Sequence, residues 1–346
     1  MDFLSVVGTR PQIVKLAVID DAFSKANIGH SYIDTGQHYD PSLSDEIQSD
    51  LGVKPPISNL RIGSHSHAIQ TARIMEALEK EIDRYSPRTI LVYGDTNSTI
   101  AATLVAVKMG IKVAHIEAGL RSFNRSMPEE LNRVATDHLA DVLFAPTNTA
   151  LSNLSEEGLS KKAFNVGDVM CDLLLRDSSK YQKISIDKFG LKQDFLVATI
   201  HRAENTDSKD RLEELINSFS TIPNQIVLFA HPRLSARLNQ FNLEFSKNVH
   251  VRNPATHSEL LSWAISSAGI ITDSGGLQKE AFILKIPCTT IRNETEWIET
   301  LENGWNVLVD DLSNFSSLLN TNRNRPHSNP FGDGKAAERI VSHLVG

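Results

Sequence analysis

The sequence has few cysteines and no long apolar run, and each absence excludes a class of protein. Only two cysteines occur in 346 residues, and neither Cys171 nor Cys288 has a CxxC or Cys/His companion. A disulfide framework and a zinc site are therefore excluded, and no metal is expected. The apolar runs are interrupted by Ser and Gly well short of the roughly 20 residues that a membrane-spanning helix requires. We expect no membrane segment.

Positive charge is also scarce. Lys and Arg number 35 against 42 Asp and Glu, the net charge is −7, and the basic residues form no stripe. Nucleic acids and anionic membranes both require a basic surface, so neither is expected as a partner. The opening MDFLSVVG resembles a strand rather than a basic segment followed by a long apolar stretch. No secretory signal is therefore expected, and the predicted location is cytoplasmic.

Short apolar runs bounded by turns alternate with helical stretches along most of the chain. The runs are FLSVVG, SYIDTG, TILVYGD, IKVAHIEAG and VLFAPT, followed by FLVATIH, QIVLFAH, GIITDSGG and PCTTIR. This alternation is typical of parallel sheets covered by helices, because parallel strands need long crossovers. The length exceeds what one core supports. We predict an α/β protein of two Rossmann-like domains, 1–166 and 167–330, with a central cleft and a terminal helix in 331–346.

The first strand run leads into a turn suited to phosphate. In VVGTRPQIVK, Gly8 permits a tight turn, Arg10 carries five donors, and Lys15 follows one helical turn later. Helix N-termini at the carboxyl ends of parallel strands favour anions. An ordinary strand-to-helix turn with a solvated Arg10 is the alternative interpretation.

A second such turn, ITDSGGLQKEA, lies in the other half of the chain. Ser274, Gly275 and Gly276 place backbone amides around an anion, and Glu280, one turn further on, is within reach of a ribose. The alternative is a plain helix cap at Asp273 or Ser274. Neither turn is GxGxxG and no GxxxxGK[ST] occurs, which disfavours nicotinamide cofactors and P-loop chemistry. No cofactor is expected. One turn in each half indicates a diphosphate ligand that bridges the two domains.

Three carboxylates follow strand runs or begin a helix. Asp95 follows ILVYG, Glu117 follows VAHI, and Glu129 lies in MPEELNR. We interpret them as candidate acids and bases of one cleft. An Asx turn before Thr96 is the alternative for Asp95, and an ordinary helix start is the alternative for Glu129.

His201 ends a strand run in the second half, in VATIHRAENTD, and His231 ends the neighbouring run, LFAHPR. Such a polar cluster can supply proton donors and positive charge to a leaving phosphate, although a single His is more often structural. His65 and His67, in GSHSH, are interpreted as a solvated turn.

Together, the motifs GTRP, TGQHYD, YGDTNST, AHIEAGLRS, PEELNR, HRAEN and TDSGGLQKEA resemble the non-hydrolysing UDP-N-acetylglucosamine 2-epimerase family. The resemblance spans Gly8 to about Val309. It implies a GT-B-like fold, a UDP-sugar substrate, a homodimer, and a terminal helix that returns to the first domain. It also implies inversion at C2 without a redox cofactor, through loss of UDP and its re-addition to a 2-acetamidoglucal, to supply precursors of cell-surface polysaccharides.

The resemblance also assigns roles to matching residues. It implies that the acid/base and sugar-orienting residues are Asp95, Glu117 and Glu129, with His201 at the diphosphate. The residues implied to bind UDP or substrate are Arg10, Lys15, Ser274, Gly275, Gly276 and Glu280. Some members bind a second substrate molecule as an activator, and the matching positions here are Gln37, His38 and Arg73.

The chain departs from the family pattern in two places. ETEWIE at 294–299 stands where many members read TERPE, and with the following NGWN it is similar to the branch that acts on UDP-2,3-diacetamido-2,3-dideoxyglucuronic acid. Trp297 thereby replaces an Arg-Pro step, and Gln12 stands where Glu is common. The sugar is therefore left open. The alternative functions are a GT-B glycosyltransferase, a hydrolysing epimerase and a non-catalytic sugar-nucleotide sensor.

Overall fold

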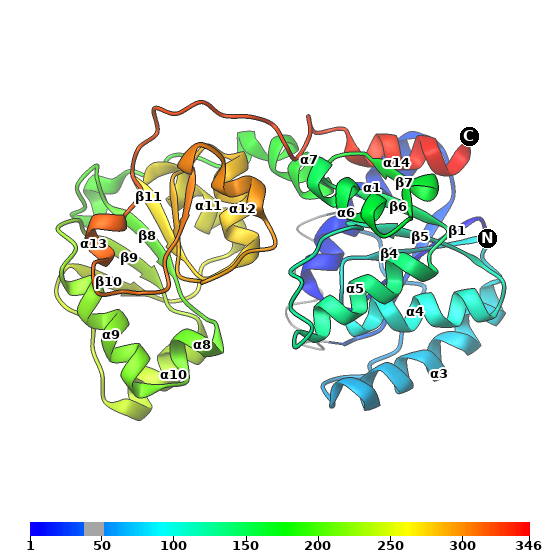
Figure 1. Ribbon diagram of the computed structural model, residues 1–346, viewed down its shortest axis with the longest axis horizontal. Coiled ribbons are helices and arrows are strands. Elements are labelled where there is room, and N and C mark those ends of the chain that lie inside the picture. The colour runs from blue at the N-terminus through cyan, green and yellow to red at the C-terminus, as the bar shows by residue number, and fades with distance from the viewer. Residues whose placement is uncertain (38–51) are drawn as a thin grey trace. The chain divides into compact units, whose positions relative to one another are not determined.

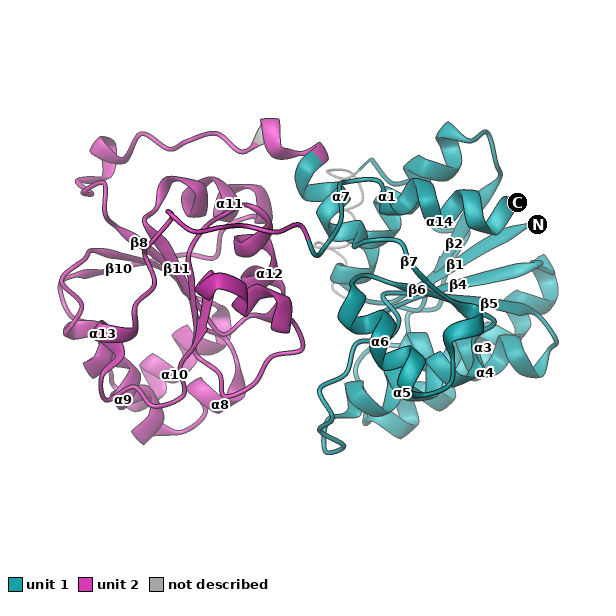
Figure 2. Cartoon of the chain, turned by 45° about the horizontal axis from the view of Figure 1, so that its top comes forward, with its two compact units in different colours: residues 1–175, 330–346 teal, residues 176–329 magenta. Residues whose placement is uncertain are grey.

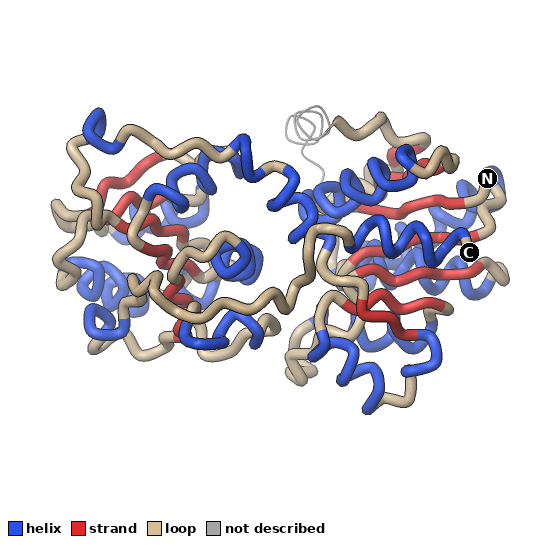
Figure 3. Tube along the Cα trace, turned by 90° about the horizontal axis from the view of Figure 1, so that it is seen from above, coloured by secondary structure: helices blue, strands red, loops and turns tan. Residues whose placement is uncertain are grey.

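The computed structural model describes residues 1–37 and 52–346, which form two compact units (Figure 1, Figure 2). Unit 1 comprises residues 1–175 and 330–346, and unit 2 comprises residues 176–329. In each unit, helices cover a sheet of parallel strands (Figure 3). The two-sheet parallel α/β class predicted from the sequence is confirmed.

Unit 1 is built on a seven-stranded sheet in the order β3-β2-β1-β4-β5-β6-β7. The pairs resolved in it are parallel, and the central strands are buried because helices cover both faces. The strands are β1 (Phe3–Val7), β2 (His30–Asp34), β3 (Ser58–Asn59), β4 (Thr89–Tyr93), β5 (Lys112–Ile116), β6 (Val142–Ala145) and β7 (Ala163–Asn165).

The helices of unit 1 enclose its core and include the end of the chain. They are α1 (Arg10–Lys25), α3 (His67–Tyr85), α4 (Asn97–Lys108), α5 (Pro128–Leu139), α6 (Asn148–Glu156), α7 (Val169–Arg176) and α14 (Ala336–Val345), with a 3₁₀ turn η1 (Ser160–Lys162). α14 packs against α1 (Figure 1), and its Ile340 and Val341 enter the same core as Leu16. The Asp172 carboxylate accepts hydrogen bonds from the first two amides of α14, at 3.0 and 2.8 Å. These bonds attach the chain terminus to α7.

Residue 166, the boundary expected from the sequence, precedes α7. Val169 and Leu173 of α7 pack into the core of unit 1, and the division between the units therefore falls after Leu175.

Unit 2 contains a six-stranded parallel sheet in the order β10-β9-β8-β11-β12-β13. Its strands are β8 (Leu196–Thr199), β9 (Ile226–Phe229), β10 (Val249–Arg252), β11 (Gly269–Thr272), β12 (Cys288–Thr290) and β13 (Asn306–Leu308). Its helices are α8 (Ala203–Thr206), α9 (Lys209–Ser220), α10 (Pro232–Phe241), α11 (His257–Ser266), α12 (Gly275–Ile283) and α13 (Phe315–Leu318), with 3₁₀ segments η2 (Ser178–Lys180), η3 (Ile186–Phe189) and η4 (Ile298–Gly304).

The strands of unit 2 divide their side chains between two cores. Leu196 and Ala198 of β8 face a cluster that includes Leu212 and Phe219, whereas Val197 between them faces a second cluster around Trp263. This alternation follows from the two-residue period of a strand. Both faces of the sheet are therefore covered.

Both sheets reverse their strand order once, between β1 and β4 in unit 1 and between β8 and β11 in unit 2. In open α/β sheets, the carboxyl ends of the strands at such a point form the crevice that binds ligands. The turns after β1, β4, β8 and β11 carry Arg10, Asp95, His201 and Ser274 respectively. The strand order alone therefore brings these predicted site residues to the switch points of their sheets.

The nine apolar runs of the sequence correspond to nine strands. The remaining strands, β3, β7, β10 and β13, are the outer strands of the two sheets, have two to four residues, and are only partly buried. Their side chains therefore give no continuous apolar run.

Both cysteines are buried, and burial raises the pKa of the Cys288 thiol to about 12. No helix in the described ranges is long and apolar enough to cross a bilayer.

Replacing Gly8 with Ala is expected to destabilise unit 1. A Cβ atom at this position would overlap the buried hydroxyl oxygens of Thr35 and Ser98, and overpacking of this kind costs about 1–3 kcal/mol. Urea denaturation measures the change. Gly29→Ala is the matched control, because a Cβ there meets no atom within 4 Å. Equal unfolding midpoints for the two variants would contradict this packing argument.

Candidate active site

Asp95 lies in the turn between β4 and α4. Thr96, rather than Asp95, is the N-cap of α4, and its hydroxyl accepts a hydrogen bond from the Thr99 amide at 3.3 Å. The Asp95 carboxylate instead accepts from Nη2 of Arg133 at 2.6 Å and is partly exposed. Asp95 is therefore a charged side chain at the carboxyl end of β4. It is held by an arginine and is not the cap of the helix.

The first turn of α5 contains two glutamates with different surroundings. Glu129, the residue singled out from the sequence, is exposed, whereas Glu130 is buried. The Glu130 carboxylate accepts hydrogen bonds from the amides of Ser122 and Phe123 at 3.0 and 2.9 Å. It also accepts from Nη1 of Arg133 at 2.9 Å. Glu130 therefore holds both the loop before α5 and the arginine that binds the β4 carboxylate, a role that the sequence did not reveal.

Glu117 directly follows β5 and has an unusual backbone conformation. Its φ is +70°, in the left-handed region that residues other than glycine rarely adopt. Its carboxylate is buried and forms an ion pair with Lys15 of α1. A Cβ added to Gly94 would lie 3.2 Å from Oε2 of Glu117 and 3.5 Å from Nζ of Lys15, so the pair contacts the turn that carries Asp95. Strained backbone of this kind is concentrated at functional sites.

The turn after β1 is connected to the turn after β4 by Gln12. The Gln12 side chain accepts from the Gly8 amide at 2.9 Å and donates to the Tyr93 carbonyl at 2.7 Å. A glutamate here would place a carboxylate oxygen against that carbonyl, so the amide suits this chain. Arg10 begins α1 and is exposed.

The residues predicted for an effector site are in different surroundings. Gln37 is buried, and its Oε1 accepts from the Ser98 amide at 3.0 Å and the Ser98 hydroxyl at 2.7 Å. Arg73 is exposed on α3, with Nη1 2.6 Å from Nε2 of His65. His38 lies outside the described residues.

A buried network of charged side chains joins the end of β5 and the segment after it to α5 and the end of α6. Arg121 binds Asp137 at 2.8 Å and both oxygens of Glu157 at 2.7 Å. Burial acts against ionisation of Asp137, but His115 and Arg121 together hold the pKa of this carboxyl below its ordinary value. Hydrogen bonds from Arg121 likewise lower the pKa of Glu157. No local pattern in the sequence indicates this network, although His115 and Arg121 lie within AHIEAGLRS.

In unit 2, Asp273 joins the turns after β8 and β11. Its side chain is completely buried and accepts from the amides of His201 and Arg202 at 3.1 and 2.9 Å, and from Nδ2 of Asn205 at 3.1 Å. Nδ1 of the half-exposed His201 lies 3.2 Å from Oδ1 of Asp273. His201 is therefore oriented by a buried carboxylate, with part of its ring accessible.

The N-terminus of α12 begins beside this carboxylate. Ser274 is the N-cap and accepts from the Leu277 amide at 3.3 Å, so the cap interpretation of this residue is also correct. A Cβ on Gly275 would overlap Oε1 of Glu296, so the Glu296 side chain lies directly against the first turn of α12. Although burial opposes it, Arg292 and Arg202 hold the pKa of Glu296 below its ordinary value. The first amides of α12, beside these arginines, form a start suited to an anion.

Two further groups of unit 2 are paired. The buried Glu280 accepts a hydrogen bond from Nε2 of His257 at 2.8 Å. The rings of His201 and His231 lie 5.8 Å apart, and burial together with the nearby His201 and Arg233 lowers the pKa of His231. A neutral His231 beside His201 limits the positive charge of this edge near neutral pH.

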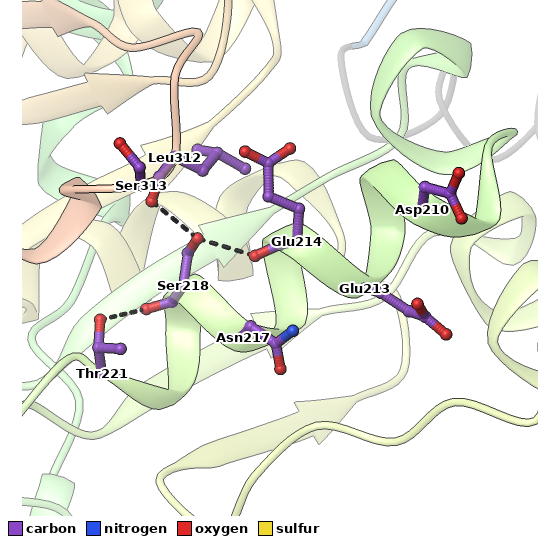
Figure 4. Close-up of a pocket in the computed structure, with 8 residues that line it drawn as sticks. All are labelled: Asp210, Glu213, Glu214, Asn217, Ser218, Thr221, Leu312 and Ser313. Atoms are coloured by element: carbon purple, nitrogen blue, oxygen red, sulfur yellow. Dashed lines mark hydrogen bonds between the residues drawn. The ribbon is translucent and has the colours of Figure 1, made fainter.

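A hollow of about 540 Å³ lies on α9 and is lined by none of the predicted site residues (Figure 4). Three carboxylates line it, and the Ser218 hydroxyl donates to the carbonyls of Glu214 and Leu312 at 2.8 and 3.0 Å. Within residues 1–37 and 52–346, no three His, Cys, Asp or Glu side chains are arranged to hold a metal ion.

The two parallel sheets, each with ionisable groups at its switch point, define a protein of the GT-B-like α/β class. The chain belongs to the UDP-N-acetylglucosamine 2-epimerase family, whose model matches residues 21–345. The membership predicted from the motifs is thereby confirmed, and the protein is an isomerase.

The chain is similar to several known members over nearly its whole length. A UDP-N-acetylglucosamine 2-epimerase homologue of Methanococcus maripaludis is 42% identical and covers 99% of each chain. The UDP-2,3-diacetamido-2,3-dideoxy-D-glucuronate 2-epimerase of Pseudomonas aeruginosa is 38% identical, over 100% of this chain and 99% of the relative. The crystal structure of the Methanocaldococcus jannaschii UDP-GlcNAc 2-epimerase with UDP-GlcNAc and UDP superposes with a TM-score of 0.89, at 40% identity, over 100% and 99% of the two chains.

The charged network predicts how stability depends on pH. Because the folded state lowers the pKa of Glu157, its contribution to stability is present above the ordinary carboxyl value of about 4.5 and is lost as the pH falls through the lower folded value. Glu157→Gln is therefore expected to be less stable than the native protein near neutral pH, with a difference that shrinks on acidification. Urea denaturation over a pH series measures this. The exposed neighbour provides a control, Glu156→Gln, and an equal pH trend in both variants would contradict the assignment.

Proposed function

We propose that this protein inverts the configuration at C2 of a UDP-2-acetamido sugar without releasing the free sugar. A base removes the C2 proton, the C1–O bond breaks with its electron pair passing to UDP, and a C1=C2 double bond forms. UDP then adds back to C1 as a proton is delivered to the opposite face of C2. The observation that carries the proposal is Glu117: a buried carboxylate in a strained conformation, ion-paired with Lys15, beside the turn of Asp95.

The groups of unit 1 suit two-faced proton transfer at C2. Asp95 and Glu117 follow neighbouring strands, and each has a different cation, Arg133 for the first and Lys15 for the second. Different cationic partners and different exposure are the means by which two carboxylates acquire separate acid and base roles. Glu129, exposed on α5, is assigned to orienting the sugar, and Arg10 to the phosphates.

The groups of unit 2 suit the leaving diphosphate. The start of α12 at Ser274, Gly275 and Gly276 supplies backbone amides, and His201 is held by Asp273 in an accessible position. Donors that are already fixed in place stabilise a developing anion without reorganising during the reaction. Glu280 is assigned to the ribose hydroxyls.

UDP-N-acetylglucosamine is the proposed substrate, and the family match and the UDP-GlcNAc complex of the Methanocaldococcus relative support it. The diacetamido-glucuronate analogue is the second candidate. The Pseudomonas relative, at 38% identity, supports it as a candidate, and so does the ETEWIE segment, in which the buried Trp297 has its ring 3.8 Å from the ammonium of Lys279. A homodimer, an effector site at Gln37, His38 and Arg73, a cytoplasmic location and a role in polysaccharide synthesis stay predictions.

The proposal is tested by proton NMR in D₂O, with UDP-N-acetylglucosamine and, separately, its diacetamido-uronate analogue. We expect deuterium at C2 together with the manno epimer still linked to UDP. Asp95→Asn and Glu117→Gln are each expected to lower turnover by at least about 100-fold, the scale of general acid–base catalysis, while UDP binding is retained. Glu156→Gln serves as the carboxylate control. Native turnover in both site variants would refute their catalytic roles, and absence of exchange with either substrate would refute the proposed reaction.

The ribose assignment of Glu280 is tested separately by calorimetry. Glu280→Ala is expected to weaken UDP binding by roughly 10- to 100-fold, the range for hydrogen bonds to a charged group, because the ribose hydroxyls lose their acceptor. Binding of 2′,3′-dideoxy-UDP is expected to be equal in the native protein and the variant. An equal loss for both nucleotides would instead point to a general disturbance around His257.

A further inference from the structure

The Gly94 turn is held by β5 through both of its backbone groups. The Gly94 amide donates to the Ile116 carbonyl at 3.0 Å, and the Gly94 carbonyl accepts from Nε2 of His115 at 2.8 Å. Gly94 has a φ of +61° and directly precedes Asp95. The position of the Asp95 backbone therefore depends on the His115 side chain.

A single carboxylate extends this restraint to Glu117. Oδ1 of Asp137 lies 2.6 Å from Nδ1 of His115, and Oδ2 accepts from the Gly119 amide at 3.0 Å. Glu117 and Gly119 both have positive φ, +70° and +83°. Asp137 thus reaches the Glu117 segment directly and the Asp95 segment through His115. Strained backbone persists only where its surroundings over-determine it.

The hydrogen-bond partners determine the protons on His115. The Gly94 carbonyl can only accept, so Nε2 carries a proton. An ionised Asp137 can only accept as well, so Nδ1 carries the second proton. Both side chains are completely buried, and the resulting imidazolium and the Arg121 guanidinium are balanced by Asp137 and Glu157. Burial of charge requires such pairing.

We propose that Asp137 and a doubly protonated His115 are positioning residues of the epimerase, which together fix the backbone of the two segments that carry Asp95 and Glu117. The inference rests on the proposed function. Neither residue is assigned a contact with substrate. They act by holding the two carboxylates in the geometry required for proton transfer, where displacements of about 1 Å are known to lower rates by about 100-fold.

Two substitutions of His115 separate its two hydrogen bonds. The amide nitrogen of glutamine reaches the position of Nε2, so His115→Gln keeps the bond to Gly94. The amide nitrogen of asparagine reaches the position of Nδ1. His115→Asn therefore keeps the hydrogen bond to Asp137 and loses the hydrogen bond to the Gly94 carbonyl. We expect kcat for C2 exchange to fall roughly 30- to 100-fold in His115→Asn and less than about fivefold in His115→Gln, with KM within about threefold in both.

His30 provides the matched control. Its side chain is buried as well, in the same sheet at the amino end of β2, with Nδ1 2.8 Å from Asp20 and Nε2 2.8 Å from the Ser5 hydroxyl. His30→Asn is expected to lower the unfolding midpoint without changing kcat. A fall in kcat in His30→Asn as large as in His115→Asn would overturn the proposal, because general loss of stability would then account for both.

Nitrogen-15 NMR of the histidine rings gives a readout independent of activity. From the hydrogen-bond geometry we expect both His115 nitrogens of the native protein to carry a proton. In Asp137→Asn, whose amide can donate to Nδ1, we expect only Nε2 to be protonated. A singly protonated His115 in the native protein, or equal kcat for the Gln and Asn variants of His115, would overturn the proposal. Failure of the proposed function would instead appear as absent C2 exchange in the native enzyme.

Discussion

The buried carboxylate of Asp137 is the contact on which the arrangement of unit 1 most depends. It lies between a histidine and an arginine and accepts a backbone amide as well, so it binds the segment 115–121 at three points. A buried charge is costly unless its partners satisfy it, and here two of the partners, His115 and the Gly119 amide, also hold the segments that carry Asp95 and Glu117. The same interaction that makes the charge tolerable therefore orders the turns after β4 and β5.

Unit 2 uses the same principle with a different chemistry. Asp273 is likewise completely buried at a switch point and accepts two backbone amides and a side-chain amide. In unit 1 the buried acid supports the segments that carry Asp95 and Glu117, whereas in unit 2 it supports a histidine beside a helix start. The two sheets share one strand order, and the residues in their turns make one edge suited to proton transfer and the other suited to binding an anion.

Several features followed from the sequence because they depend on local pattern. The inner strands are covered on both faces, so each appears as a continuous apolar run, and the strand ends then locate Asp95, Glu117, His201 and Ser274. The outer strands β3, β7, β10 and β13 are short and half-exposed and left no such signal. The motifs added the family, because seven of them in fixed order are far more specific than any one.

The sequence by itself determined the α/β class, the family and the residues that end the strands. The class follows from the spacing of apolar residues, the strand ends from the turn residues, and the family from the order of the motifs. Only the tertiary structure decided which residue caps α4, which carboxylate is buried and which is held by a cation. Thr96 rather than Asp95 is the cap, and Glu130 rather than Glu129 is buried. These outcomes depend on groups distant along the chain, such as Arg133 against Asp95 and His115 against Asp137, and no local pattern encodes contacts of that kind.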